Sequence, residues 1–455
     1  MYAKNVWKDA SKEKNESIFS FNEDYKAFLT NAKTERMATK EAVALAEKNG
    51  FKNLADVKSV KPGDKIYTVN KDKNFLAVII GRKSIEEGMR VLGAHIDSPR
   101  LDIKQNPLTE KGGLAYFETH YYGGIKKYQW VTTPLAIHGV VYKKDGSHVD
   151  VAIGEDPTDP VFGVTDLLIH LSADQMSKPL AKAIEGEDLD INVGSIPAKG
   201  EKEESVKKFV TGLLKEKYGM EEEDFLSSEL VAVPAGPARD YGLDRSMVAG
   251  YGHDDKVCAY TSLRAVLDQK DVPEFASVVV LVDKEEVGSI GATGAQSAWF
   301  ENTVAELLAL EGKESNLAVR HAMANTKMLS SDVSCAVDPL YASVNEPHNS
   351  CYFGKGLVFN KYTGARGKSG CNDAMPEFLA FVRKAMDENE IHYQTSEIGK
   401  VDAGGGGTIA YILGNYNMYV LDAGVPVLSM HAPMELVSKA DVYEAYLGYK
   451  AFLLA

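Results

Sequence analysis

SVVVLVDKEEVGS, residues 277–289, joins an apolar run directly to four charged residues. Residues 277–282 are mostly β-branched or apolar, which is typical of a strand buried on both faces. Asp283, Lys284, Glu285 and Glu286 follow at its carboxyl end, where ligands of α/β proteins bind. The stretch therefore predicts an α/β fold in which Glu285 and Glu286 divide the work, one binding a metal and the other handling a proton.

Chain length, net charge and cysteine content limit the class of protein. At 455 residues the chain exceeds the size at which single cores stop growing, so two domains are expected. Its 65 acidic against 51 basic residues give a net charge of −14, which argues against a nucleic-acid surface. The charged N-terminus lacks a secretory signal, no apolar run approaches the length of a membrane span, and four cysteines without a CxxC pair favour a reducing compartment. We expect a cytoplasmic protein that binds neither nucleic acid nor membrane.

Apolar periodicity and turn residues outline the other elements. Helices are predicted at 21–29, 39–49, 206–214, 253–267, 295–320 and 440–454, and strands at 75–80, 90–92 and 425–430. A hairpin is predicted at 131–154, turning at Lys144-Asp145-Gly146.

A change of amino-acid composition after Arg100 indicates an inserted module. Residues 116–130 are aromatic and glycine-rich, a further run over 164–171 carries His170, and the loop 233–237 resembles a linker. We therefore predict a discontinuous catalytic domain, 1–100 and 236–455, and an inserted domain, 101–235.

Five short stretches share one design, an acidic residue or histidine just after an apolar run or a small residue. They are His95-Ile96-Asp97, Asp254-Asp255, Glu285-Glu286, Asp332 and His431. Histidine and carboxylate ligands suit zinc, cobalt or manganese, and a carboxylate can bridge two cations about 3.5–4 Å apart. For any single acidic pair, a solvated surface is the alternative interpretation.

Other chemistries fit the sequence less well. The glycine-rich stretch 403–408 has no following lysine, as a phosphate-binding Walker motif requires. Ser289 does not stand in a Gly-x-Ser-x-Gly elbow, and no cysteine has a distinctive nucleophile context.

In this order, the stretches resemble the aspartyl aminopeptidase and yeast vacuolar aminopeptidase I family of dinuclear zinc metallopeptidases. The resemblance rests on Gly93-Ala94-His95-Ile96-Asp97-Ser98-Pro99, Glu285-Glu286-Val287-Gly288-Ser289, Ser331-Asp332, Ser429-Met430-His431 and the run Leu168-Ile169-His170-Leu171. It implies a mixed-sheet zinc-exopeptidase catalytic domain with helices on both faces, plus an inserted β-rich dimerisation domain.

The resemblance also implies a role for each residue. His95 and Asp332 would hold one metal, Glu286 and His431 the other, and Asp254 would bridge both, most simply as zinc with cobalt or manganese as alternatives. Glu285 would be the general base that activates the metal-bound water. These assignments imply a metallo-aminopeptidase that removes N-terminal residues from peptides.

Two further positions complete the implied site. Asp97 would steady His95, and His170 would reach the active site of a neighbouring subunit, within dimers that assemble into a tetrahedral dodecamer. A histidine packed on a strand is the alternative for His170. The family usually has Leu-Asp-Asn where this chain has His253-Asp254-Asp255, so Asp255 stays an alternative to Asp254.

Three points stay open at this stage. An acidic substrate side chain would require a cation, which Arg366 or Lys368 in the loop 364–370 could supply, although either charge could simply be solvated. A two-metal phosphoesterase would use the same ligands. A non-catalytic metal-binding assembly scaffold is the third reading.

Overall fold

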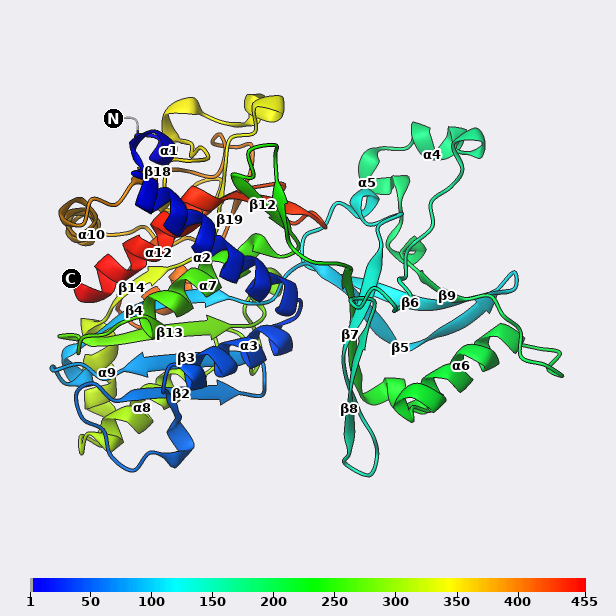
Figure 1. The fold of residues 1–455 in the computed structure, drawn as a ribbon, viewed down its shortest axis with the longest axis horizontal. Coiled ribbons are helices and arrows are strands. Elements are labelled where there is room, and N and C mark those ends of the chain that lie inside the picture. Colours follow the sequence, from blue (N-terminus) through cyan, green and yellow to red (C-terminus); the bar gives the residue numbers. More distant parts are fainter. Residues whose placement is uncertain (1–2) are drawn as a thin grey trace. The chain divides into compact units, whose positions relative to one another are not determined.

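The strand predicted from residues 277–282 is β13 (Ala276–Val282), an inner strand of a nine-stranded sheet in the computed structural model, which describes residues 3–455 (Figure 1). All seven of its residues are buried. Val279 and Leu281 belong to one hydrophobic core, whereas Val278 and Val280 belong to another. The prediction of a strand buried on both faces is confirmed, because successive side chains of a strand point to opposite faces.

The large sheet mixes parallel and antiparallel neighbours. Its strands, in spatial order, are β1 (Lys52–Asn53), β2 (Lys65–Asn70), β3 (Asn74–Ile79), β13, β4 (Met89–His95), β14 (Lys327–Ser330), β20 (Tyr419–Gly424), β16 (Leu357–Asn360) and β18 (Tyr393–Thr395). Strands β13, β4, β14 and β20 run parallel, while β3 and β16 are antiparallel to their neighbours β13 and β20. The mixed α/β class predicted from the sequence is confirmed.

Helices cover both faces of this sheet. The first core contains side chains of α2 (Lys12–Asn31), α3 (Glu35–Lys48), α7 (His253–Leu267), α10 (Pro376–Glu388) and α12 (Lys439–Leu454). The second contains side chains of α8 (Trp299–Leu310), α9 (Asn316–Asn325) and α11 (Ala410–Gly414). The faces are separate because alternate strand residues supply each core.

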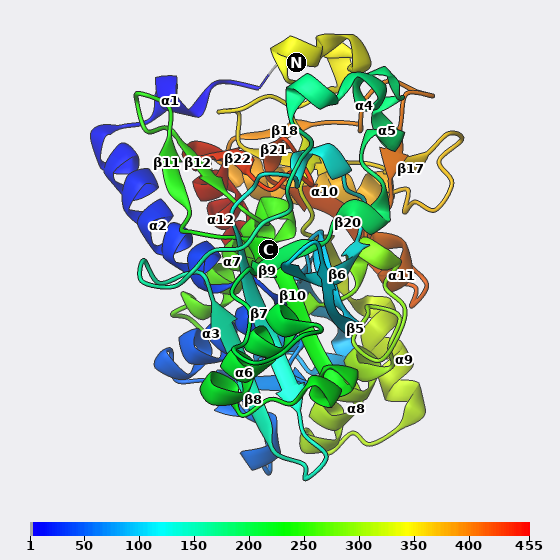
Figure 2. The same cartoon turned by 90° about the vertical axis from the view of Figure 1, so that its right-hand side faces the viewer.

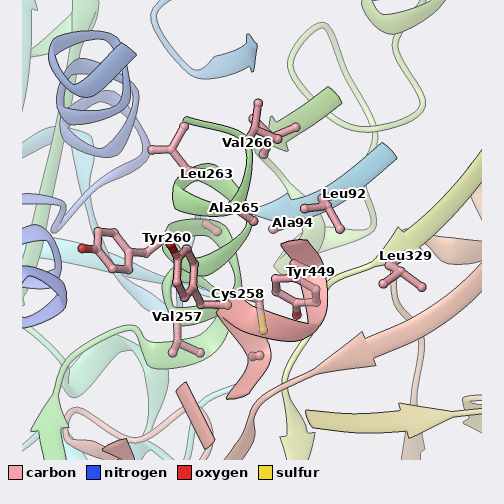
Figure 3. Close-up of a cluster of buried hydrophobic side chains, with 14 of the residues drawn as sticks. Leu92, Ala94, Val257, Cys258, Tyr260, Leu263, Ala265, Val266, Leu329 and Tyr449 are labelled. Atoms are coloured by element: carbon pink, nitrogen blue, oxygen red, sulfur yellow. The ribbon is translucent and has the colours of Figure 1, made fainter. Parts of the chain in front are cut away.

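Helix α7 is buried on nearly every side. Fourteen of its fifteen residues are buried, which is typical of a helix inside a core rather than on a surface. Figure 3 shows Val257, Cys258 and Leu263 of α7 together with Tyr449 of α12, and α7 also packs against β4. This packing holds the first turn of α7, with Asp254 and Asp255, close to the sheet.

Contacts group the residues into two units. Unit 1 contains the residues up to Asp97, Ala238–Met430 and Glu435–Ala455; unit 2 contains Ser98–Pro237 and His431–Met434. Unit 1 also holds α1 (Val6–Asp9), a five-stranded sheet and a small two-stranded sheet. Their strands are β11 (Arg239–Tyr241), β12 (Met247–Gly250), β22 (Glu435–Ser438), β21 (Pro426–Leu428) and β15 (Ser334–Cys335), and β17 (Gly364–Ala365) with β19 (Gly405–Gly406).

Unit 2 is built on a six-stranded antiparallel sheet. The strand order is β8 (His148–Ile153), β7 (Leu135–Tyr142), β10 (Ser228–Pro234), β5 (Arg100–Lys111), β6 (Leu114–Tyr122) and β9 (Ile191–Gly194). Helix α6 (Ser205–Tyr218) packs against β5, β6 and β9 (Figure 2), and the short helices α4 (Ala173–Ser177) and α5 (Leu180–Ala183) precede β9. The hairpin predicted at 131–154 is β7 and β8, joined through Gly146 in a left-handed conformation.

Two predicted elements, and the alternative of a packed strand at His170, are wrong in detail. The helix predicted at 295–320 is two helices, α8 and α9, because Gly312 adopts the left-handed conformation just after α8. Val233 and Pro234 pair with β7 as the end of β10, so they are strand and not linker. The run 164–171 ends in a short 3-10 helix, η4 (Ile169–Leu171), and not in a packed strand.

Within residues 3–455, no helix combines the length and the apolar content that a membrane span requires.

Candidate active site

The candidate site lies at the carboxyl ends of three parallel neighbours, β4, β13 and β14. Their register pairs Val282 with His95 and Ser330 with Gly93, so the three strands end at the same edge. Glu285 follows β13, and Asp332 follows β14 by two residues. The edge predicted from the sequence as a ligand site therefore collects residues from four of the five stretches.

His95 is the centre of the group. Its Nε2 atom lies 3.2 Å from Oδ1 of Asp254 and 3.8 Å from Oε2 of Glu285. Its Nδ1 atom lies 3.0 Å from the carbonyl oxygen and 3.3 Å from Oδ1 of Asp97. A proton on Nδ1 donates to Asp97, which orients Nε2 towards the carboxylates, as a metal-binding histidine requires.

The first turn of α7 supplies two carboxylates with different surroundings. Asp255 is fully buried, and its Oδ2 accepts the backbone N–H of His95 at 3.2 Å. Asp254 instead faces Nε2 of His95, and its own backbone N–H donates to Oε2 of Glu435 at 3.0 Å. The preceding His253 is a core residue, hydrogen-bonded through Nδ1 to a tyrosine hydroxyl at 2.6 Å.

The acidic pair after β13 lies on the short 3-10 helix η7 (Glu285–Val287). The carboxylate of Asp97 accepts the backbone N–H of Glu285 at 3.1 Å and that of Glu286 at 3.2 Å. Lys284 adopts a left-handed conformation, and its N–H donates to Oδ1 of Asp283 at 2.8 Å. Asp97 and Asp283 thus fix the backbone on which both glutamates stand.

Two groups of side chains could each hold a metal ion. His95, Asp254 and Glu286 form one, and His95, Asp255 and Asp332 form the other, with candidate ligand atoms within 4.8 Å of one another in each. Imidazole with carboxylates is a donor set for zinc, cobalt or manganese. Both groups include His95, so the candidate metal donors of the cluster are arranged around this one histidine.

The electrostatics of the cluster also favour cations. Burial disfavours charge on His95, but hydrogen bonds with Asp254 and Asp97 raise its pKa well above the usual range. Burial and the nearby Asp255 raise the pKa of Asp332 well above its ordinary value, and burial likewise raises the pKa of Asp255. Crowded, buried carboxylates resist ionisation, and divalent cations would supply the opposite charge.

Three further predicted residues have their own local surroundings. His431 belongs to unit 2, where its Nδ1 lies 2.8 Å from the carbonyl oxygen of Gly124, and neither group of candidate ligands in residues 3–455 includes it. His170 is exposed on η4, also in unit 2. The ammonium of Lys368 pairs with Asp373 at 3.0 Å.

Sequence reasoning missed two contributors. Glu435, which accepts the backbone N–H of Asp254, is the first residue of the short strand β22 and belongs to no sequence motif. Asp283 lies in the stretch 277–289 but received no role from the sequence. Its position directly after β13 could have indicated that it belongs to the site. The structure brings together His95, Asp97, Asp254, Glu285, Glu286 and Asp332.

Comparisons with known proteins agree with this geometry. The model of the family described as aminopeptidase I zinc metalloprotease (M18) matches residues 28–453. A probable M18 family aminopeptidase 1 from Clostridium acetobutylicum is 55% identical over 99% of this chain and 98% of its own. The crystal structure of an M18 aminopeptidase from Thermotoga maritima, 43% identical, superposes with a TM-score of 0.96 over 100% of this chain and 99% of that chain. The S. cerevisiae mApe1 dodecamer structure, 20% identical, shares the fold with a TM-score of 0.75 over 94% of this chain and 95% of that one.

Proposed function

Because this chain belongs to the aminopeptidase I zinc metalloprotease (M18) family, and is therefore a metallo-aminopeptidase, we propose that it removes N-terminal residues at the cluster around His95. The convergence of two candidate ligand groups on this histidine, beside Glu285, is the observation that carries the proposal.

We assign the ligands of two divalent ions as follows. His95 and Asp332 would hold one ion, Glu286 and His431 would hold the other, and Asp254 would be shared by both. Support for Asp254 over Asp255 comes from its position opposite Nε2 of His95, since Asp255 is occupied with a backbone N–H. Zinc is the proposed metal, because the family is described as a zinc metalloprotease.

Glu285 is the proposed general base. When bound, divalent cations in such a site polarise a carbonyl group and lower the pKa of water. The carboxylate of Glu285, close to Nε2 of His95, then takes a proton from the attacking water and delivers it to the leaving amine nitrogen. Its neighbour Glu286 is committed to a ligand position, so the two adjacent carboxylates have different tasks.

The rival functions have less support. A two-metal phosphoesterase would need the same ligands, but the family match over residues 28–453 favours peptide substrates. A scaffold without activity would not need Glu285 held beside the cluster through its backbone.

We also propose a cytoplasmic homo-oligomer, with dimers assembling into a tetrahedral dodecamer. Unit 2 exposes an apolar segment that assembly would cover. Its exposed side chains are Leu167, Leu168, Ile169, Leu171, Met176 and Leu180. The distant yeast structure that shares the fold is a dodecamer. His170 lies within this segment, and in our proposal it donates to the active site of a neighbouring subunit, so that activity depends on assembly.

A panel of aminoacyl p-nitroanilides, with metal added, tests the function. Glu285→Gln should bind metal and fold like the wild type but lose most turnover, and an active Glu285→Gln enzyme would remove this residue as the base. His431→Ala should lower the metal content below that of the wild type, and unchanged content by elemental analysis would exclude it as a ligand. A phosphodiester assayed in parallel distinguishes the rival enzyme class.

A further inference from the structure

The loop that carries the catalytic pair is closed at its base by Asp283. One carboxylate oxygen of Asp283 accepts the N–H of Lys284 at 2.8 Å, and the other accepts the hydroxyl of Thr293 at 2.7 Å. The backbone N–H of Asp283 also donates to the carbonyl oxygen of Thr293 at 3.2 Å. Asp283 therefore joins the two ends of the segment on which Glu285 and Glu286 stand.

A buried lysine from a distant part of the chain lies behind Asp283. Nζ of Lys73 is 3.1 Å from Oε1 of Glu35 and 4.0 Å from Oδ2 of Asp283, and the three side chains are 9%, 2% and 0% exposed. Glu35 is the first residue of α3, and Lys73 lies in the turn between β2 and β3. The amide of Asn74, next to Lys73, donates to the same carbonyl oxygen of Thr293 at 2.5 Å.

The charges explain why an ammonium group is needed at this place. Burial raises the pKa of Asp283 to about 6, the carboxylates of Glu35 and Asp97 add to the rise, and Lys73 opposes it. An ionised Asp283 accepts these hydrogen bonds more strongly than a protonated one, because a charged acceptor strengthens each hydrogen bond. Replacing the cation by an apolar group would leave several carboxylates buried together, which is costly.

We propose that Lys73 is a positioning residue for catalysis. Its ammonium group holds Asp283 where the carboxylate can hydrogen-bond both ends of the 284–293 segment, so that Glu285 faces His95. This inference rests on the proposed role of Glu285 as general base. In this role Lys73 acts through Asp283 and the backbone of the segment.

Kinetics of the metal-loaded enzyme with an aminoacyl p-nitroanilide test the proposal. Lys73→Met removes the charge at similar volume, Lys73→Arg restores it, and Thr293→Val removes the second donor to Asp283 without altering Lys73. Lys83→Met is the matched control, because Lys83 is 45% exposed and pairs with Glu87 at the surface. Metal content and far-UV circular dichroism are measured on every variant.

Lys73→Met and Thr293→Val are expected to lower kcat by about ten- to a hundredfold, the scale of a small misplacement of a catalytic group, with KM changed less than about twofold. Lys73→Arg should recover most of the loss, and metal content should match the wild type. A kcat of Lys73→Met within twofold of the Lys83→Met control would overturn the proposal, as would a loss that vanishes once rates are divided by metal content. An inactive wild type or an active Glu285→Gln enzyme would instead contradict the proposed function, so the two failures can be told apart.

Discussion

Asp97→Asn is expected to slow turnover by about 30- to 1000-fold, because this side chain holds the backbone of Glu285, the proposed base, and of Glu286. The carboxylate of Asp97 is fully buried and accepts the N–H groups of Glu285 and Glu286 at 3.1 and 3.2 Å. Each hydrogen bond to a charged acceptor contributes roughly 1.5–3 kcal/mol, and a neutral one about 1 kcal/mol.

Asparagine offers one oxygen in place of two. One N–H would keep a weaker, neutral hydrogen bond, and the other would face the NH₂ group with no acceptor. The combined loss is roughly 2–4 kcal/mol. If the loss appears in the placement of Glu285, it corresponds to the stated range, since about 1.4 kcal/mol changes a rate tenfold.

The assay is kcat of the metal-loaded variant with an aminoacyl p-nitroanilide, alongside metal content and the urea midpoint. Asp72→Asn is the control, because the side chain of Asp72 is 74% exposed. A kcat within threefold of the wild type at equal metal content would refute the reasoning. A fall in kcat that only tracks a fall in metal content would instead show that Asp97 acts by orienting His95.

Three further outcomes follow from the structure. Burial raises the pKa of Asp422 to about 7, above its ordinary 3.8, so this group stabilises the fold below about pH 4 and the stabilisation is lost as pH rises through 7. Asp422→Asn should remove that loss and gain as much as about 4 kcal/mol relative to the wild type between pH 4 and pH 8, measured by urea unfolding; parallel pH profiles would contradict it. Leu263→Ala, in the buried α7, should cost about 2–5 kcal/mol of unfolding free energy, whereas Leu317→Ala, 60% exposed, should change it by less than about 0.5 kcal/mol. Chelation should lower the thermal midpoint, because a metal that binds only the folded state stabilises it, and added zinc should restore it; an unchanged midpoint in calorimetry would argue against a bound metal.

Local sequence patterns predicted many of the elements. The β-branched run of β13, the Lys-Asp-Gly turn of the β7–β8 hairpin and the apolar period of α12 are properties of neighbouring residues. The break between α8 and α9 was also predictable from neighbouring residues, because Gly312 is a helix stop signal. It was overlooked because apolar residues continue at helical spacing on both sides. The end of β10 was missed because a segment rich in proline and glycine is typical of loops. In the structure, this end is a strand because it pairs with β7.

By itself, the sequence determined the fold class, the residue types able to bind a metal, and, through the order of its motifs, the family. Only the tertiary structure decided that the backbone N–H of Glu285 meets Asp97, 188 residues away, that Asp254 faces Nε2 of His95, and that Lys73 lies behind Asp283. The reason is physical. Apolar periodicity records which face of an element is buried, but many strand orders would bury the same faces. The order that places β13 between β3 and β4 selects which polar side chains meet at the edge.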